Sequence, residues 1–335
     1  MSNVTLSDPV IIGAYSLDGD RKYKNDLSAL KYLKIPNFKK NSINLNEGNY
    51  KDKDKKYDTM ERIKQMTSYI MDNSENVMKN RIIDADFVCF RGALKNLMMT
   101  PYSKYPNWIV KAVKFKGTIY FIIETNFNDY KVNLKVDDKS YQYGFKFESY
   151  ILSSDPEDNP KGKSETVNEN EEFCILMSRT IDNSIKILFG IESDGVDGNK
   201  VNSLDDLKKS KLVEVKTFFD KGTPMNDYTK LGWWCQSYIA AIDQIHVGLR
   251  DSRGFVTGIK AVNLKELEDS TKRNNCLKFL KKFLIEIKGK MKDVDDPKKV
   301  YCFKWNQKQM KVDAYLDKND VFLSDNYVNF MNDLI

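Results

Sequence analysis

The sequence predicts a mixed α/β (α+β) protein with a central β-sheet and flanking helices. Some stretches alternate apolar and polar residues, others carry apolar residues at helical spacing, and the two kinds are interspersed along the chain. The 335 residues, 41% of them hydrophobic and 30% charged, are enough to bury a sizeable core. Because large sheets often organise domains of this length, we expect a single domain over residues 1–335.

Strands are expected where β-branched and aromatic residues are dense. The segment 108–124 alternates apolar and polar residues and is interrupted at Gly117 and Thr118, which indicates a β-hairpin. Further strands are expected over residues 141–152, 172–179, 184–192 and 212–218.

Helices are expected where apolar residues recur every three or four positions. Asp58 and Glu61 form a capping-box pattern that predicts a helix over residues 58–78. The apolar spacing also predicts helices over residues 227–243 and 274–291.

Two polar segments, residues 39–57 and 153–172, are expected to be surface loops. The formal net charge of +6 is compatible with a polyanionic partner but decides little by itself. The N-terminus lacks a basic start followed by a long apolar run, and no later stretch holds eighteen apolar residues. We therefore expect a protein that is neither secreted nor membrane-spanning, located in the nucleus or the cytoplasm with the nucleus favoured.

The composition argues against several classes of site. The five cysteines are widely spaced without a CxxC pair, which indicates reduced intracellular thiols rather than a zinc knuckle or disulfide framework. His246 is the only histidine, so zinc sites built on several histidines are excluded. The sequence has no GxxxxGK[ST] or GxGxxG motif, so no motif supports ATP hydrolysis or dinucleotide binding.

The segment 187–216 carries the most informative chemistry. Glu192 and Asp194 are two residues apart on an expected strand, so both carboxylates should leave the same face. Glu214 and Lys216 should likewise share one face of the following strand. If the two strands are neighbours, three carboxylates and one ammonium group converge.

Such a patch suits phosphodiester hydrolysis. Magnesium takes a few carboxylate oxygens and completes its shell with waters and phosphate oxygens, and a nearby lysine can orient water or neutralise charge. Lys146 and Glu148, on one face of another expected strand, offer a fourth carboxylate. The alternative for such short patterns is an ion-pair ladder on an exposed strand.

Several sequence blocks, in this order, resemble the DXO decapping exoribonucleases. The resemblance covers roughly residues 11–330. Its blocks are YSLD at 15–18, FRG at 90–92, MTPY at 99–102, GFKFE at 144–148, ESD at 192–194, EVK at 214–216, WWCQSY at 233–238, GLRD at 248–251 and GFV at 254–256.

The resemblance implies a PD-(D/E)xK nuclease-like core, which is a twisted mixed sheet with flanking helices. It also implies a metal-dependent hydrolase of RNA 5′ ends that uses two ions of Mg²⁺ or Mn²⁺. Members of this family degrade 5′-monophosphate RNA from the 5′ end, and various members remove pyrophosphate, unmethylated cap dinucleotide or NAD.

The resemblance also implies roles for individual residues. Glu148, Asp194, Glu214 and the Val215 carbonyl would ligate one metal ion, and Glu192 and Asp194 would serve the second. Lys216, Gln236 and Glu192 would be catalytic, and Arg91, Lys146 and Gln236 would contact the substrate.

Two positions depart from the family pattern: Gly232 stands where a basic residue is usual, and Phe90 where many members have tryptophan. These departures affect substrate preference more than metal chemistry. Trp234 and Tyr238 match the apolar stripe of their helix and are expected in the core rather than against bases.

The expected partner is the single-stranded 5′ end of RNA, with a larger 5′–3′ exoribonuclease as a candidate protein partner. One alternative function is that of a non-catalytic stabilising partner of such a nuclear exoribonuclease. Another is a DNA-specific nuclease on the same core, which would cleave duplex DNA and be indifferent to the 2′-hydroxyl.

Overall fold

A computed structural model describes residues 3–37, 43–51, 59–104, 108–125, 138–306, 308–317 and 320–334 of the chain. Two large sheets organise these residues. In the described residues the first has nine strands, in the order β19 (Lys311–Asp317), β18 (Val300–Asn306), β8 (Trp108–Phe115), β9 (Thr118–Thr125), β7 (Phe87–Phe90), β13 (Ile185–Glu192), β12 (Glu172–Ile181), β1 (Val10–Leu17) and β2 (Tyr23–Lys24).

The second sheet has six strands in the same described ranges. Their order is β10 (Leu152–Ser153), β3 (Tyr32–Leu33), β14 (Gly195–Asp197), β15 (Lys211–Phe219), β16 (Gln244–Arg250) and β17 (Val256–Asn263). Two short ladders pair β11 (Val167–Asn168) with β4 (Tyr50–Lys51) and β5 (Met78–Lys79) with β6 (Ile82–Ile83).

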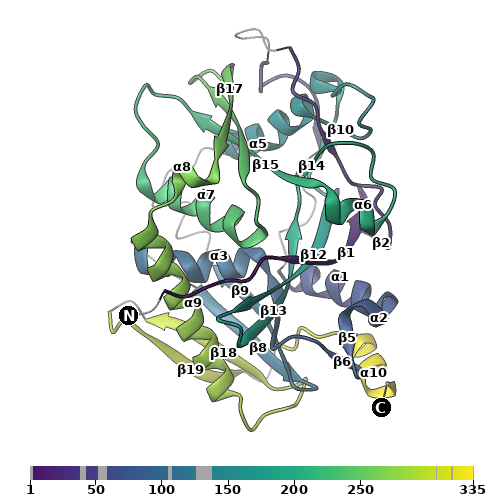
Figure 1. Cartoon of the computed structure of the whole chain (residues 1–335), viewed down its shortest axis with the longest axis vertical. Coiled ribbons are helices and arrows are strands. Elements are labelled where there is room, and N and C mark those ends of the chain that lie inside the picture. The colour runs from purple at the N-terminus through teal and green to yellow at the C-terminus, as the bar shows by residue number, and fades with distance from the viewer. Residues whose placement is uncertain are drawn as a thin grey trace.

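Helices flank both sheets. They are α1 (Thr59–Asp72), α2 (Ser74–Val77), α3 (Arg91–Met99), α5 (Asp138–Ile151), α6 (Leu204–Lys209), α7 (Asp227–Ala240), α8 (Leu264–Leu267), α9 (Ser270–Lys290) and α10 (Asp325–Asp333), with 3₁₀ turns η1 (Thr100–Tyr102) and η2 (Gly162–Ser164). In Figure 1, β15 and β17 lie in the upper part of the molecule, β8 and β18 in the lower part, and α3 between them.

Both sheets mix parallel and antiparallel pairs. In the first, β7 runs parallel to β9 and β13, whereas β8 and β9 form an antiparallel pair. In the second, β15 runs parallel to β16, which pairs antiparallel with β17. The mixed α/β class predicted from the sequence is confirmed.

Most predicted elements are present with small shifts at their ends. The expected hairpin is formed by β8 and β9, and three expected strands are β12, β13 and β15. Two expected helices are α7 and α9, and the one expected over residues 58–78 is divided into α1 and α2. Asp58, the first residue of the capping-box pattern, lies outside the described residues.

The nine-stranded sheet separates two cores, because successive side chains of a strand point to opposite faces. On β8, Val110 and Ala112 lie in the core that contains the buried residues of α3, α7 and α9. Val113 and Phe115 lie in the core that contains those of α1 and α10. One layer of helices therefore covers each face of this sheet.

The strand expected over residues 141–152 is wrong, because most of this segment forms helix α5. Its aromatic residues at every second position are typical of a strand, but Tyr143, Phe147 and Ile151 also recur every fourth residue. These three are buried in one cluster with Val213 and Val215 of β15. Packing of this stripe on the second sheet therefore decides for the helix.

The strand expected to carry both Glu192 and Asp194 is divided between the two sheets. β13 ends at Glu192 in the first sheet, and β14 begins at Gly195 in the second. Gly195 pairs with Val213 of β15, and a Cβ atom at Gly195 would lie only 2.6 Å from the Lys31 carbonyl oxygen. Asp194 therefore sits at the passage from one sheet to the other.

The two polar segments are not simple surface loops. Ile43 and Leu45 are buried in the segment 39–57, of which residues 38–42 and 52–58 lie outside the described ranges. In the segment 153–172, Glu169, Asn170 and Glu172 are buried. Of these three, Glu172 belongs to the site described below.

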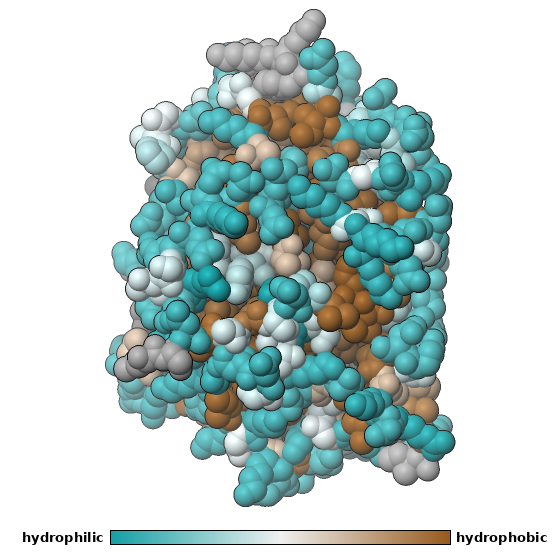
Figure 2. All heavy atoms as spheres, viewed as in Figure 1, coloured by the Kyte–Doolittle hydropathy of each residue, from teal (hydrophilic) through white to brown (hydrophobic). Residues whose placement is uncertain are grey.

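The face seen in Figure 2 is mostly hydrophilic, with hydrophobic residues in separate patches between the polar ones. No helix in the described part of the chain is both long and apolar enough to cross a membrane.

Candidate active site

Strand β15 carries the centre of the site. Glu214 and Lys216 alternate with Val213 and Val215 along the strand, and the two valines pack on the cluster that holds α5. Glu214 is only 1% exposed, and the Lys216 ammonium donates a hydrogen bond to its Oε1. The predicted division of β15 into an apolar and a charged face is confirmed.

Two helices bring further partners to Glu214. Arg91 is the first residue of α3, and its Nη1 lies 2.9 Å from Glu214 Oε2 while its Nη2 donates to the Glu192 carbonyl at 3.0 Å. Gln236 of α7 donates from Nε2 to Glu214 Oε1 at 2.5 Å. Burial would raise the pKa of Glu214, but Lys216 and Arg91 lower it to about 2.

Asp194 approaches β15 from the passage between the sheets. Its Oδ2 accepts a hydrogen bond from the Val215 backbone N–H at 2.6 Å. Burial and the nearby charge of Glu214 raise the pKa of Asp194 to about 7. The structure therefore brings Asp194 to the Glu214 side of the site, and the role of the Val215 carbonyl stays a prediction.

Glu148 reaches the same region from helix α5. Burial and the nearby Asp194 raise its pKa well above the usual range of a carboxyl group. Lys146 does not accompany it, because residues two apart on a helix point in different directions. The Lys146 ammonium donates to the Asn49 carbonyl at 2.5 Å and lies 5.8 Å from the Tyr50 ring centroid. The expected shared face of Lys146 and Glu148 is wrong.

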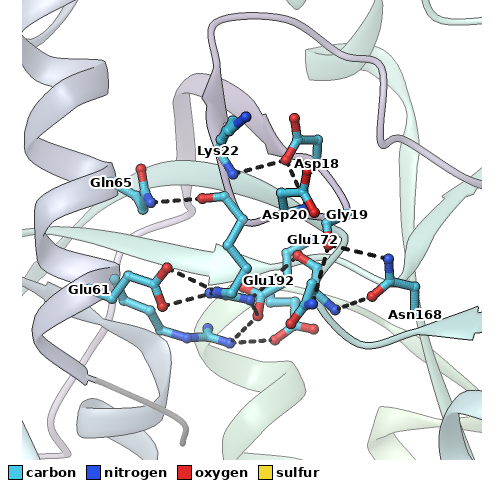
Figure 3. A network of polar contacts seen from close by, with 12 residues as sticks. Asp18, Gly19, Asp20, Lys22, Glu61, Gln65, Asn168, Glu172 and Glu192 are labelled. Atoms are coloured by element: carbon cyan, nitrogen blue, oxygen red, sulfur yellow. Dashed lines mark hydrogen bonds and ion pairs between the residues drawn. The ribbon is translucent and has the colours of Figure 1, made fainter. Parts of the chain in front are cut away.

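Glu192 is held by a partly buried network of ion pairs (Figure 3). Arg62 of α1 contacts Glu192 Oε2 at 2.8 Å and Glu172 Oε1 at 3.1 Å. Arg21 contacts Glu172 at 2.9 Å and Glu61 at 2.9 Å. This network ties Glu192 to α1, to the turn after β1 and to the start of β12.

Sequence reasoning missed this network and a lysine of helix α3. Lys95 Nζ donates to Gln236 Oε1 at 2.8 Å. Burial and the nearby Lys216 lower the pKa of Lys95 to about 8. Its position four residues after Arg91 was the available signal, since both then lie on one face of a helix.

The acidic residues suit a divalent cation in kind and in charge. Glu148, Glu192, Asp194 and Glu172 line a cleft that is partly open to solvent. All four offer oxygen ligands. Burial raises the pKa values of Glu148, Asp194 and Glu172, and repulsion from neighbouring carboxylates raises them further. A cation of the Mg²⁺ or Mn²⁺ kind would relieve that repulsion.

The carboxylate groups of the site are not arranged around one common metal position. Within the described residues, no group of three or more acidic, cysteine or histidine side chains is arranged to hold a metal ion. Glu214 faces Arg91 and Lys216, and Glu192 faces Arg62. Metal binding would therefore require Glu214 and Glu192 to leave these ion pairs and to bind the metal ion instead.

Most of the predicted site residues thus lie in one region. Contacts or electrostatic interactions connect Arg91, Glu148, Glu192, Asp194, Glu214, Val215, Lys216 and Gln236. Their individual roles in catalysis and metal binding stay predictions. Trp234, which is 1% exposed, stacks on Tyr238 and is in the core as predicted.

Comparison with known proteins identifies the family. The family model described as RAI1 like PD-(D/E)XK nuclease matches residues 7–329. A decapping and exoribonuclease protein of Xenopus laevis is 28% identical over 355 residues, which cover 97% of this chain and 86% of the relative.

Two solved structures share the fold. Candida albicans Rai1, in complex with pU5 and Mn²⁺, superposes with a TM-score of 0.77 at 18% identity, covering 99% of this chain and 96% of that one. Scheffersomyces stipitis Rai1, in complex with 3′-NADP⁺ and calcium, gives 0.78 at 18% identity, covering 99% and 97%. With a family model that spans nearly the whole sequence, the chain belongs to the RAI1-like PD-(D/E)XK nucleases, as its resemblance to the DXO decapping exoribonucleases predicted.

Proposed function

We propose that this nuclease hydrolyses phosphate bonds at the 5′ end of RNA with the help of divalent metal ions. The observation that carries the proposal is the contact of Glu214 with Lys216, Arg91 and Gln236, beside Asp194. Relatives named as decapping and exoribonuclease proteins, and a structural neighbour bound to pU5 and Mn²⁺, support the choice of RNA.

The residues fit a hydrolytic site that acts on a polyanion. Glu148, Glu192, Asp194 and Glu214 would hold the metal ions, and we propose two ions of Mg²⁺ or Mn²⁺. Bound there, the metal would polarise the phosphate and lower the pKa of the attacking water.

The remaining polar side chains would orient the water molecule and neutralise the charge of the phosphate. Lys216 and Gln236 meet at the same oxygen of Glu214, so both can hold a water molecule beside that carboxylate. Arg91 can turn from Glu214 towards a phosphate once a metal ion compensates that carboxylate, because its guanidinium suits two phosphate oxygens. Such an enzyme must process many RNA sequences and would grip the backbone rather than base edges, so we expect little base specificity.

The experiment is a panel of 5′ ends. The purified chain is incubated with RNAs that carry monophosphate, triphosphate, unmethylated cap or NAD, in Mg²⁺, Mn²⁺ or EDTA, and the released 5′ products are identified by mass. Glu214→Gln tests the site, and Glu157→Gln is the matched control, because Glu157 is exposed on a loop.

We expect metal-dependent release from at least one end, lost in Glu214→Gln and kept in Glu157→Gln. An all-deoxy oligonucleotide and a DNA duplex test the DNA-specific alternative. Absence of release from every RNA would reject the catalytic proposal and favour a stabilising partner of a larger exoribonuclease.

We also propose a nuclear location, and a larger 5′–3′ exoribonuclease as a protein partner. Imaging of a tagged chain and co-elution with such an exoribonuclease test these two points. A purely cytoplasmic signal, or separate elution of the two proteins, would contradict them.

A further inference from the structure

Helix α3 presents two cations to the site, one turn apart. Arg91 contacts Glu214 Oε2, and Lys95 contacts Gln236 Oε1. Gln236 Nε2 in turn contacts Glu214 Oε1. The four side chains therefore form a chain of three contacts, and because Arg91 and Lys95 both belong to α3, the helix closes this chain into a ring that joins α3, α7 and β15.

The chemistry of this ring fixes the direction of the Gln236 amide. An ammonium group offers only donors, a carboxylate only acceptors, and a primary amide one group of each kind. Lys95 therefore requires the oxygen of Gln236 on its side, and Glu214 requires the nitrogen on the other. The amide cannot turn over without losing both contacts.

The two contacts differ in how they would respond to a metal ion. Glu214 would give up lone pairs to a ligated cation, which weakens its hold on Gln236. The contact with Lys95 involves no expected metal ligand, so it can persist.

The position of Lys95 is an unfavourable one for a cation. Among the described residues, no carboxylate lies within ion-pair distance of Lys95, and Gln236 is the side-chain partner of its ammonium. Burial and the neighbouring cations Lys216 and Arg91 lower its pKa. A charged group kept in such surroundings, in contact with a predicted catalytic residue, is a candidate for a functional role.

We propose that Lys95 is a positioning residue, which holds the Gln236 amide in the orientation needed for hydrolysis. The proposal rests on the proposed function. It means that α3 supplies a second functional side chain to the site besides Arg91. It also predicts that Lys95 acts through Gln236 rather than on the substrate.

The test is a double-mutant cycle on the RNA end that the panel identifies. kcat and KM are measured at saturating metal for the wild type, Lys95→Met, Gln236→Ala and the double variant. Methionine keeps much of the length of lysine and removes the charge. Lys64→Met is the matched control, because Lys64 is an exposed lysine on helix α1.

We expect Lys95→Met to lower kcat on the order of 10-fold, as loss of orientation does, with little change in KM. In the Gln236→Ala background, Lys95→Met should change kcat by less than about 2-fold, because coupled residues are not additive. Lys95→Arg, which keeps a donor, should recover part of kcat, and Lys64→Met should equal the wild type.

Three results would overturn the proposal. They are independent, additive losses in the cycle, a rise in KM without a change in kcat, and full activity of Lys95→Met. Thermal unfolding of each variant identifies misfolding, and if Lys95→Met does not fold, Lys95→Gln replaces it in the cycle. An inactive wild type would instead reject the proposed function, so the two failures are distinguishable.

Discussion

At the residue scale, the environment of Glu214 shows how a buried carboxylate is kept ionised. Glu214 is 1% exposed, and Arg91, Lys216 and Gln236 supply its hydrogen bonds. Burial alone would favour the neutral acid, and the two cations reverse that preference. The charge of Glu214 is therefore part of the stability of the metal-free protein.

Glu214→Gln should lower the free energy of unfolding in EDTA. The substitution leaves Arg91 and the half-buried Lys216 without their compensating charge, and breaking a buried ion pair from one side costs about 3 kcal/mol. Urea unfolding at neutral pH measures the change, with Glu157→Gln as the control. Equal stability of the two variants would show that the charge of Glu214 contributes nothing to the fold.

Glu169 should give the stability a recognisable pH dependence. Burial and the nearby Glu192 raise its pKa in the folded protein from the ordinary 4.5 to about 7. Between these values the folded state binds the proton and the unfolded state does not, so stability falls as the pH rises from about 4.5 to 7.

The glutamine variant removes that contribution. The free energy of unfolding of the wild type relative to Glu169→Gln, measured in EDTA, should therefore decrease between pH 4.5 and pH 7. A difference that is constant across this range would mean that Glu169 titrates equally in both states.

At the element scale, helix α5 positions Glu148 through its packing on the second sheet. Phe147 is fully buried, and its ring lies against Gly248 of β16. A Cβ atom at Gly248 would lie only 2.8 Å from that ring, so the close approach of α5 depends on glycine here.

Gly248→Ala should displace α5 and weaken metal binding by Glu148. Overpacking of this kind costs roughly 1–3 kcal/mol of stability. Calorimetric titration with Mn²⁺ should show lower affinity, and thermal unfolding should show the lost stability. Gly258→Ala on the neighbouring β17 is the control, because a Cβ atom there would be 3.8 Å from the nearest atom, Leu249 Cδ1. An unchanged Mn²⁺ affinity of Gly248→Ala would show that Glu148 is not part of the metal site.

At the scale of the whole molecule, the site lies where the two sheets are joined. β13 delivers Glu192 in the first sheet, β15 delivers Glu214 in the second, and Asp194 lies in the connection. Helices α3 and α5 add Arg91 and Glu148. If the carboxylates among these residues ligate a metal ion, metal binding is coupled to the stability of the fold, because they come from several elements.

A divalent cation should therefore stabilise the whole chain. If it binds only the folded state, Mn²⁺ at about 100 times its Kd should raise the free energy of unfolding by about 2.7 kcal/mol. Thermal unfolding in Mn²⁺, Mg²⁺ or EDTA measures this, and Glu214→Gln should show a smaller rise. No metal-dependent shift in the wild type would argue against ligation by these carboxylates.

The mixed α/β class, the hairpin, three of the central strands and the helices α7 and α9 could be predicted from sequence patterns alone. Each of these has one clear periodicity, so local pattern and tertiary packing agree. The Glu214 and Lys216 pair followed from the same argument, because alternation on a strand fixes which side chains share a face.

The remaining features depend on tertiary packing. The segment 141–152 fits both periodicities, and its burial against Val213 and Val215 selected the helix, which separates Lys146 from Glu148. The passage of the chain from one sheet to the other after Glu192, and the contacts of Arg62 and Lys95, join residues far apart in the sequence. Such contacts depend on how whole elements pack, and no local pattern records them.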